Sequence, residues 1–170
     1  MLATSALIVW MTCLCSLPAY GDNTVRLWQD AYVGMSLAAL LQTVPGSEKS
    51  AGTTLGDGAV ERARLENVRL VNEDFSAIFY FNDAGLVQVT MTLDDADGFS
   101  LRQLINVYAD TVAALTAKYG EPVESEAFED VLMIYKSAWH HGELRISAVC
   151  MTIEGDVNIL NINYQIRRSK

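Results

Sequence analysis

Apolar and polar residues alternate along several stretches of the chain, and this alternation is the pattern of half-buried β-strands. The clearest case is 86–93, where Val87, Val89, Met91 and Leu93 share one side. Five further strand-like runs are found at 63–71, 75–81, 131–139, 144–153 and 157–166. Short turns join the runs within each group of three, so we expect two antiparallel meanders.

Two other stretches have apolar residues at the spacing of an amphipathic helix. The longer begins at Ser100, which with Gln103 forms a capping box, and ends at Gly120. The shorter begins at Ser36 and ends before Pro45. The order is helix, three strands, helix, three strands. It predicts an α+β fold with two helices packed on an antiparallel sheet, in an apparent duplicated α-βββ arrangement.

The N-terminal segment carries no charged side chain and contains an apolar run followed by Ala19 and Gly21. This order predicts a signal peptide over 1–21, cleaved before Asp22, and a single periplasmic or secreted domain over 22–170. The segment lacks the usual positive start, and an uncleaved membrane anchor is the alternative. We expect cleavage, and no stable membrane insertion afterwards.

Removal of that segment would remove two of the three cysteines and leave Cys150. A single thiol forms no internal disulfide, so the domain must be stable without one. Cys150 lies in an apolar strand-like run. We expect it to be buried and structural, because a reactive thiol needs an accessible, electropositive setting.

Acidic residues outnumber basic ones, 21 to 12, which gives a formal net charge of −9. A field of this sign repels nucleic acids and anionic membranes. Another protein is therefore the expected partner, and the charge favours a basic one. Solubility alone is the alternative explanation of the charge.

An acidic turn, formed by Asp94, Asp95 and Asp97, invites a calcium interpretation. In an EF-hand loop the first and last ligand positions would then be Leu93 and Leu104, which cannot bind calcium through their side chains. Acidic residues before a helix are also favoured by the helix dipole. We expect no metal there.

The two histidines, His140 and His141, are adjacent in sequence. On a strand they would point to opposite faces, so they chelate a metal poorly as a pair. The sequence contains no nucleophile elbow and no phosphate-binding glycine loop, and we expect no cofactor and no catalytic set. The remaining candidates form a predicted interaction surface that comprises Trp28, Asp94, Asp95, Asp97, His140 and His141.

Two short motifs resemble a known group of proteins. They are Gly34-Met35-Ser36-Leu37 with Pro45-Gly46, and Lys118-Tyr119-Gly120-Glu121-Pro122, each followed by a meander. They are similar to small exported bacterial proteins of the BamE and β-lactamase-inhibitor-protein type. The chain departs from BamE in lacking a lipobox and from the inhibitor in lacking a cysteine pair, and no functional residue carries over. The resemblance implies binding of another protein, not catalysis.

The predicted function is therefore non-enzymatic binding of another protein in the periplasm, as an inhibitor or an immunity-type partner. Two alternatives stay open. One is a small periplasmic enzyme or ligand carrier with a pocket between the helices and the sheet. The other is a structural or assembly component of the envelope.

Overall fold

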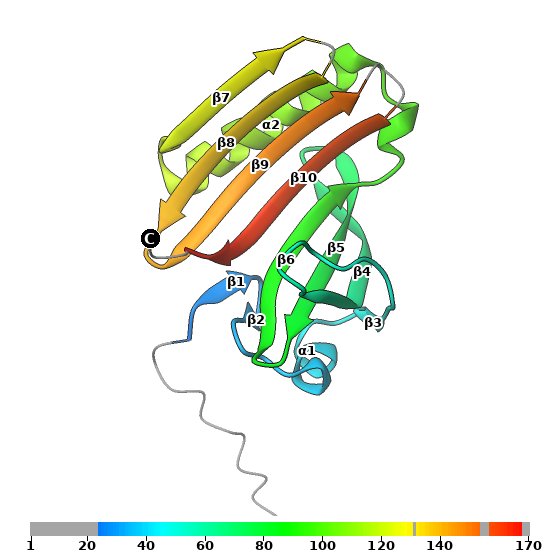
Figure 1. Cartoon of the computed structure of the whole chain (residues 1–170), viewed down its shortest axis with the longest axis vertical. Coiled ribbons are helices and arrows are strands. Elements are labelled where there is room, and N and C mark those ends of the chain that lie inside the picture. Colours follow the sequence, from blue (N-terminus) through cyan, green and yellow to red (C-terminus); the bar gives the residue numbers. More distant parts are fainter. Residues whose placement is uncertain (1–23, 131, 154–156, 168–170) are drawn as a thin grey trace, which may run out of the picture.

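The computed structural model describes residues 24–130, 132–153 and 157–167, so the predicted signal peptide lies outside the described residues. Eight strands form one antiparallel sheet (Figure 1). From one edge to the other they are β3 (Glu48–Lys49), β4 (Val60–Leu70), β5 (Glu73–Asn82), β6 (Gly85–Leu93), β10 (Val157–Ile166), β9 (Leu144–Ile153), β8 (Leu132–His141) and β7 (Glu124–Glu129). A separate pair is formed by β1 (Arg26–Trp28) and β2 (Ala31–Tyr32).

The large sheet consists of two antiparallel meanders that meet at β6 and β10. Between these strands, five residue pairs run from Asn161 opposite Thr92 to Gln165 opposite Gln88. The chain crosses from one meander to the other through a short 3-10 helix, η1 (Ala96–Gly98), and the long helix α2 (Leu101–Tyr119). The antiparallel arrangement expected from the short turns is confirmed.

The expected architecture of two helices packed on a sheet, with duplicated α-βββ units, is wrong. Of the described residues 53% lie in strands and 21% in helices, so the fold is predominantly β. The first helix, α1 (Leu37–Thr43), has seven residues. The sequence missed β7 because both of its faces are exposed and it has no apolar side. It missed β3 because that strand has only two residues.

Helix α2 agrees with the sequence in its start, its end and its buried side. The backbone N–H of Gln103 donates to Ser100 Oγ over 3.4 Å, and the side-chain Oε1 of Gln103 accepts from the backbone N–H of Ser100 over 3.0 Å. Gly120 ends the helix with a φ of 85°, a conformation that side chains disfavour. Neither helix in the part of the chain that the structure describes is long and apolar enough to span a membrane.

The main core lies between the sheet and the elements on its α2 side. Trp139 is fully buried, and its Nε1–H donates to the Gly120 carbonyl oxygen over 2.9 Å. Cys150 is buried as predicted, and burial raises the pKa of its thiol to about 11. Other fully buried members come from α1, α2 and both meanders: Leu40, Phe75, Phe79, Met91, Leu104, Ile146 and Ile162.

Candidate functional site

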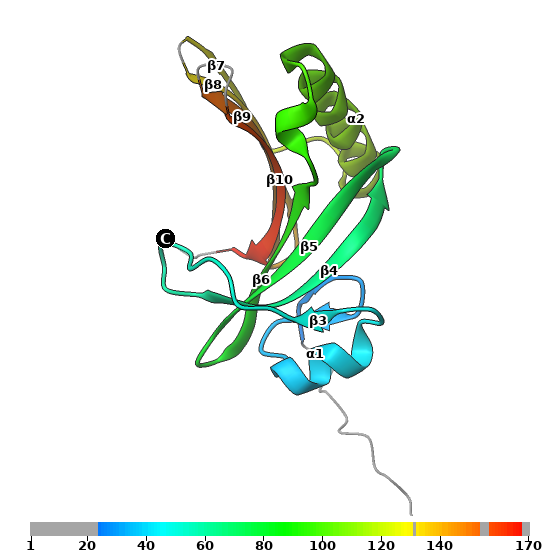
Figure 2. The ribbon, with the colours of Figure 1, turned by 90° about the vertical axis from the view of Figure 1, so that its right-hand side faces the viewer.

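One face of the large sheet is covered by the helices, and the other face is left open by them. Figure 2 shows α1, α2 and the β1–β2 pair on the same side of the sheet. The other side is concave in this view, and we call it the open face. Side chains alternate between the two faces along a strand, and residues paired directly across strands share a face. The strand register therefore shows which side chains lie together on the open face.

An apolar band crosses the open face at one end of the second meander. In one row, Phe128 pairs with Ile134, Ile134 with Met151, and Met151 with Ile159. In the next row toward the end of the strands, Leu132 pairs with Ile153 and Ile153 with Val157. The apolar band consists of the residues of both rows: Phe128, Leu132, Ile134, Met151, Ile153, Val157 and Ile159.

The apolar band does not contribute to the core. The exposed fractions are 56% for Phe128, 44% for Val157 and 42% for Ile153. Within the described ranges, no member of the band packs into either of the two buried hydrophobic clusters. Seven contiguous apolar side chains therefore lie on a face that neither of the described helices covers.

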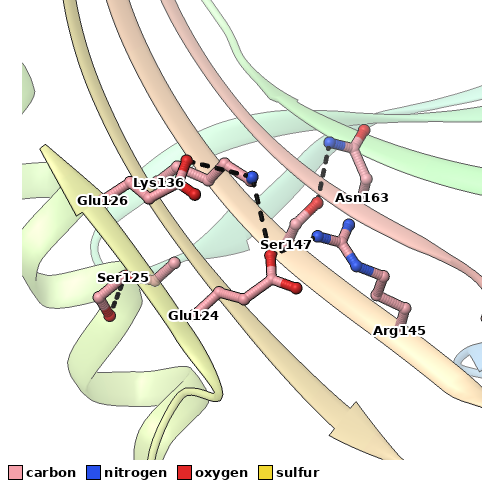
Figure 3. Close-up of polar contacts among 8 residues, drawn as sticks. Glu124, Ser125, Glu126, Lys136, Arg145, Ser147 and Asn163 are labelled. Carbon is pink, nitrogen blue, oxygen red and sulfur yellow. Dashed lines mark hydrogen bonds and ion pairs between the residues drawn. The ribbon is translucent and has the colours of Figure 1, made fainter. Parts of the chain in front are cut away.

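A charged row lies beside the apolar band, toward the other end of the strands. It consists of Glu124 and Glu126 of β7, Lys136 of β8 and Arg145 of β9 (Figure 3). Lys136 Nζ lies 3.4 Å from Glu126 Oε2 and 3.7 Å from Glu124 Oε2. Arg145 Nη2 donates to Glu124 Oε2 over 2.9 Å. This hydrogen bond and the guanidinium charge, with a smaller contribution from Lys136, hold the pKa of Glu124 below its usual value.

A ladder of hydrogen bonds fixes the polar centre of the open face. Thr90 Oγ1 donates to Asn163 Oδ1 over 2.9 Å, and Asn163 Nδ2 donates to Ser147 Oγ over 3.5 Å. Gln88 Nε2 donates to Thr90 Oγ1 over 2.9 Å. These residues belong to three neighbouring strands, so the ladder ties β6, β10 and β9 together and holds its side chains in place.

A hollow of about 1000 Å³ lies on the open face beyond this ladder. Residues 55–57 form one wall, and residues from β6, β10, β9, β8 and the edge strand β7, with Arg167 just after β10, form the rest. Two of its charged groups, Arg145 and Glu124, bind each other, and Arg167 Nη1 donates to the Gly142 carbonyl oxygen over 3.3 Å. A small ligand would have to compete with these contacts. A ligand pocket was predicted between the helices and the sheet. The hollow lies on the opposite face of the sheet from the helices.

The loop of residues 50–59, between β3 and β4, packs on the open face at β5 and is anchored by Glu61. This carboxylate is only 2% exposed. It accepts hydrogen bonds from Ser50 Oγ over 2.8 Å, from the Thr53 N–H over 3.4 Å and from Arg64 Nε over 3.2 Å. Sequence reasoning missed Glu61, because an acidic residue beside a glycine-rich loop carries no pattern that marks it as buried.

Trp28 lies on the covered side of the sheet, and two residues of the predicted acidic turn are engaged in hydrogen bonds. The Trp28 ring packs against Phe79 on the covered side, with ring centroids 6.2 Å apart. Asp94 Oδ1 accepts from Ser76 Oγ over 2.7 Å, and Asp97 Oδ1 accepts from the backbone N–H of Asn158 over 3.0 Å. Asp95 lies between them and adopts a φ of 50°.

The two histidines are the last residues of β8, at the other end of the sheet. His140 pairs with Arg145 and lines the hollow, whereas the His141 ring packs at a tilt against the Tyr119 ring, with centroids 5.8 Å apart. They are separated from the acidic turn by most of a strand, roughly 25 Å. The predicted interaction residues are therefore not brought together. The apolar band was not predicted, because it depends on the register between strands.

No protein-family model matches the chain, and no curated protein or solved structure matches it either. The resemblance to the BamE and β-lactamase-inhibitor-protein type therefore stays a prediction.

Proposed function

We propose that the protein binds another protein through the open face and performs no catalysis. The observation that carries this proposal is the apolar band, which is contiguous across four strands and contributes to neither core cluster. Contiguous exposed apolar surface on a folded domain is typical of an interaction site.

The size of the band indicates how much of the binding it can supply. Full burial of one large apolar side chain contributes about 1.5–3 kcal/mol. Phe128, Ile153 and Val157 are each about half exposed, so covering them contributes about 1 kcal/mol apiece. Together they strengthen binding by a factor of about 100, which supports an interface but does not make a tight one alone. Further contacts must come from the charged row beside the band.

The charge favours a basic partner over a second copy of this chain. The net charge is −9, so two copies repel each other at long range. The edge strand β7 carries three glutamates, of which Glu124 and Glu126 point to the open face and Glu129 to the covered side. With the apolar N-terminal segment, which supports export, these features suit an inhibitor or immunity-type partner that acts in the periplasm.

Two variants with matched exposure test the proposal. Ile153 in the band is 42% exposed, and Leu101 at the start of α2 is 39% exposed. A partner is first isolated with the wild-type protein, and its affinity is then measured with purified components. We expect Ile153→Lys to weaken binding at least about tenfold, because a charge would be buried in the interface. Leu101→Lys should bind as the wild type does.

Equal affinity for both variants would overturn the proposal. Sedimentation of the protein alone provides the second readout. A dimer that Ile153→Lys dissociates would show that a second copy, and not another protein, covers the band.

A further inference from the structure

We propose that β7 is where the partner is held, and that a basic, extended segment of the partner pairs with β7 as an additional strand of the sheet. This inference rests on the proposed function and names the chemistry of the partner. Addition of a strand to a sheet edge is an established mode of peptide recognition, in which the backbone supplies affinity and alternate side chains supply specificity.

The two edges of the sheet differ in their ability to accept a strand. β7 pairs with β8 over six consecutive residues without a register shift, and no described strand lies on its outer side. At the opposite edge, the two-residue strand β3 covers only part of β4. The pairing of β4 with β5 shifts register twice, and Asn67 of β4 has a φ of 58°. Such bulges bend an edge and block further pairing. β7 is therefore the regular, receptive edge.

The charges of β7 select the kind of strand that it can accept. Three of its six residues are glutamates: Glu124, Glu126 and Glu129. Like charges placed opposite each other across a strand pair are destabilising, so β7 of a second copy is disfavoured. A strand with basic residues at the matching positions is favoured instead. The edge is thus protected against self-pairing and open to a basic segment.

The faces of β7 specify the order of residues in the added strand. Glu124, Glu126 and Phe128 point to the open face, and the small residues Ser125 and Ala127 lie between them. Every pairing in the sheet is antiparallel, so we infer an antiparallel addition. From its N-terminus, the added strand would then read apolar-x-basic-x-basic. Its apolar residue lies beside Phe128 and extends the apolar band.

Lys136 competes with the proposed partner for the same carboxylates. Its ammonium lies 3.4 Å from Glu126 Oε2 and 3.7 Å from Glu124 Oε2. Figure 3 marks both contacts with dashed lines. Removal of Lys136 frees negative charge for the partner, whereas neutralisation of Glu126 removes it. The two members of one ion pair should therefore change affinity in opposite directions. If the ion pair had a purely structural role, both substitutions would change the affinity in the same direction.

The test uses the full chain and a capped seven-residue peptide, Thr-Ile-Thr-Arg-Thr-Lys-Thr. One control peptide has glutamates in place of the two basic residues, and another has N-methylated backbone amides. Affinities are measured by fluorescence anisotropy, and protection is mapped by amide hydrogen exchange. We expect Glu126→Gln to weaken binding about two- to fivefold and Lys136→Met to strengthen it by a similar factor, as for exposed ion pairs. The amides of β7 should exchange more slowly with peptide bound.

Several results would overturn the proposal. They are an absence of binding at millimolar peptide, equal affinity of the N-methylated or glutamate peptide, the same direction of change in both variants, or protection away from β7. If Ile153→Lys still weakens binding of the isolated partner at least about tenfold, the open face remains the binding site and only the strand addition is wrong. If the peptide does not bind at β7 and Ile153→Lys also leaves binding of the partner unchanged, the proposed function is wrong as well.

Discussion

Glu61 is a carboxylate removed from water at the foot of the loop 50–59. An ionised carboxylate is costly to bury unless it is fully bonded. Glu61 is bonded by a hydroxyl, a backbone N–H and the guanidinium of Arg64. The Cα of Gly52 approaches so closely that an added Cβ would overlap the Glu61 carboxylate. One side chain thus positions the loop that forms a wall of the hollow.

Replacement of Glu61 tests this anchoring role. Glu61→Ala leaves the Ser50 hydroxyl and the Thr53 N–H without their acceptor, and we expect a loss of about 1–3 kcal/mol in the free energy of unfolding. Urea unfolding measures the change. Glu66, an exposed carboxylate on the same strand, provides the control variant Glu66→Ala. An equal loss in both variants would show that Glu61 does not anchor the loop.

Arg145 and Glu124 give a prediction about pH. Because Arg145 lowers the pKa of Glu124 in the folded protein, the pair stabilises the fold above the ordinary pKa of a glutamate. That stabilisation is lost as the pH falls through the lowered pKa. In Arg145→Met we expect the pKa of Glu124, measured by NMR titration, to rise toward its usual value. Lys136→Met should raise it less, and an unchanged pKa in Arg145→Met would contradict the geometry.

At the scale of elements, the sequence predicts best where one element carries its own pattern. Helix α2 has a cap, an apolar side and a glycine stop within 21 residues, and all three are found in the structure. β4 has an irregular pattern because two register shifts interrupt its alternation. β7 has no apolar side, so only its pairing with β8 makes it a strand.

The candidate site was harder to predict than the elements, for a related reason. The alternation in the last strand indicates that Asn161, Asn163 and Gln165 share a side. It does not indicate which residues of β7, β8 and β9 lie beside them. The apolar band exists only because four strands pair in one particular register, which depends on contacts between residues far apart in the sequence.

The Ser100 side chain caps the start of α2, and we expect this cap to stabilise the fold. Ser100→Ala removes the acceptor for the Gln103 N–H, and we expect the free energy of unfolding to fall by about 1 kcal/mol. Thermal unfolding followed by circular dichroism measures the shift. Arg102→Ala, at an exposed position of the same turn, should change stability by less than about 0.5 kcal/mol. If Ser100→Ala is as stable as Arg102→Ala, the capping box contributes nothing.

For the whole molecule, the central feature is a sheet with two unlike faces. One face is covered by both helices and the β1–β2 pair and forms the core. The other is concave, carries an apolar band at one end and a charged row beside it, and ends at a regular acidic edge. The first face accounts for the stability of the described domain, in which Cys150 is a free, buried thiol, and the second has the features of a docking surface.

Site-specific photo-cross-linking tests the role of the open face most directly. A photoreactive residue is placed at position 153 in the apolar band or at position 101 on α2, in the cell that produces the protein. We expect a discrete adduct with another protein from position 153 and none from position 101. An adduct formed from position 101 alone, or equally from both positions, would contradict the assignment of the open face as the binding surface.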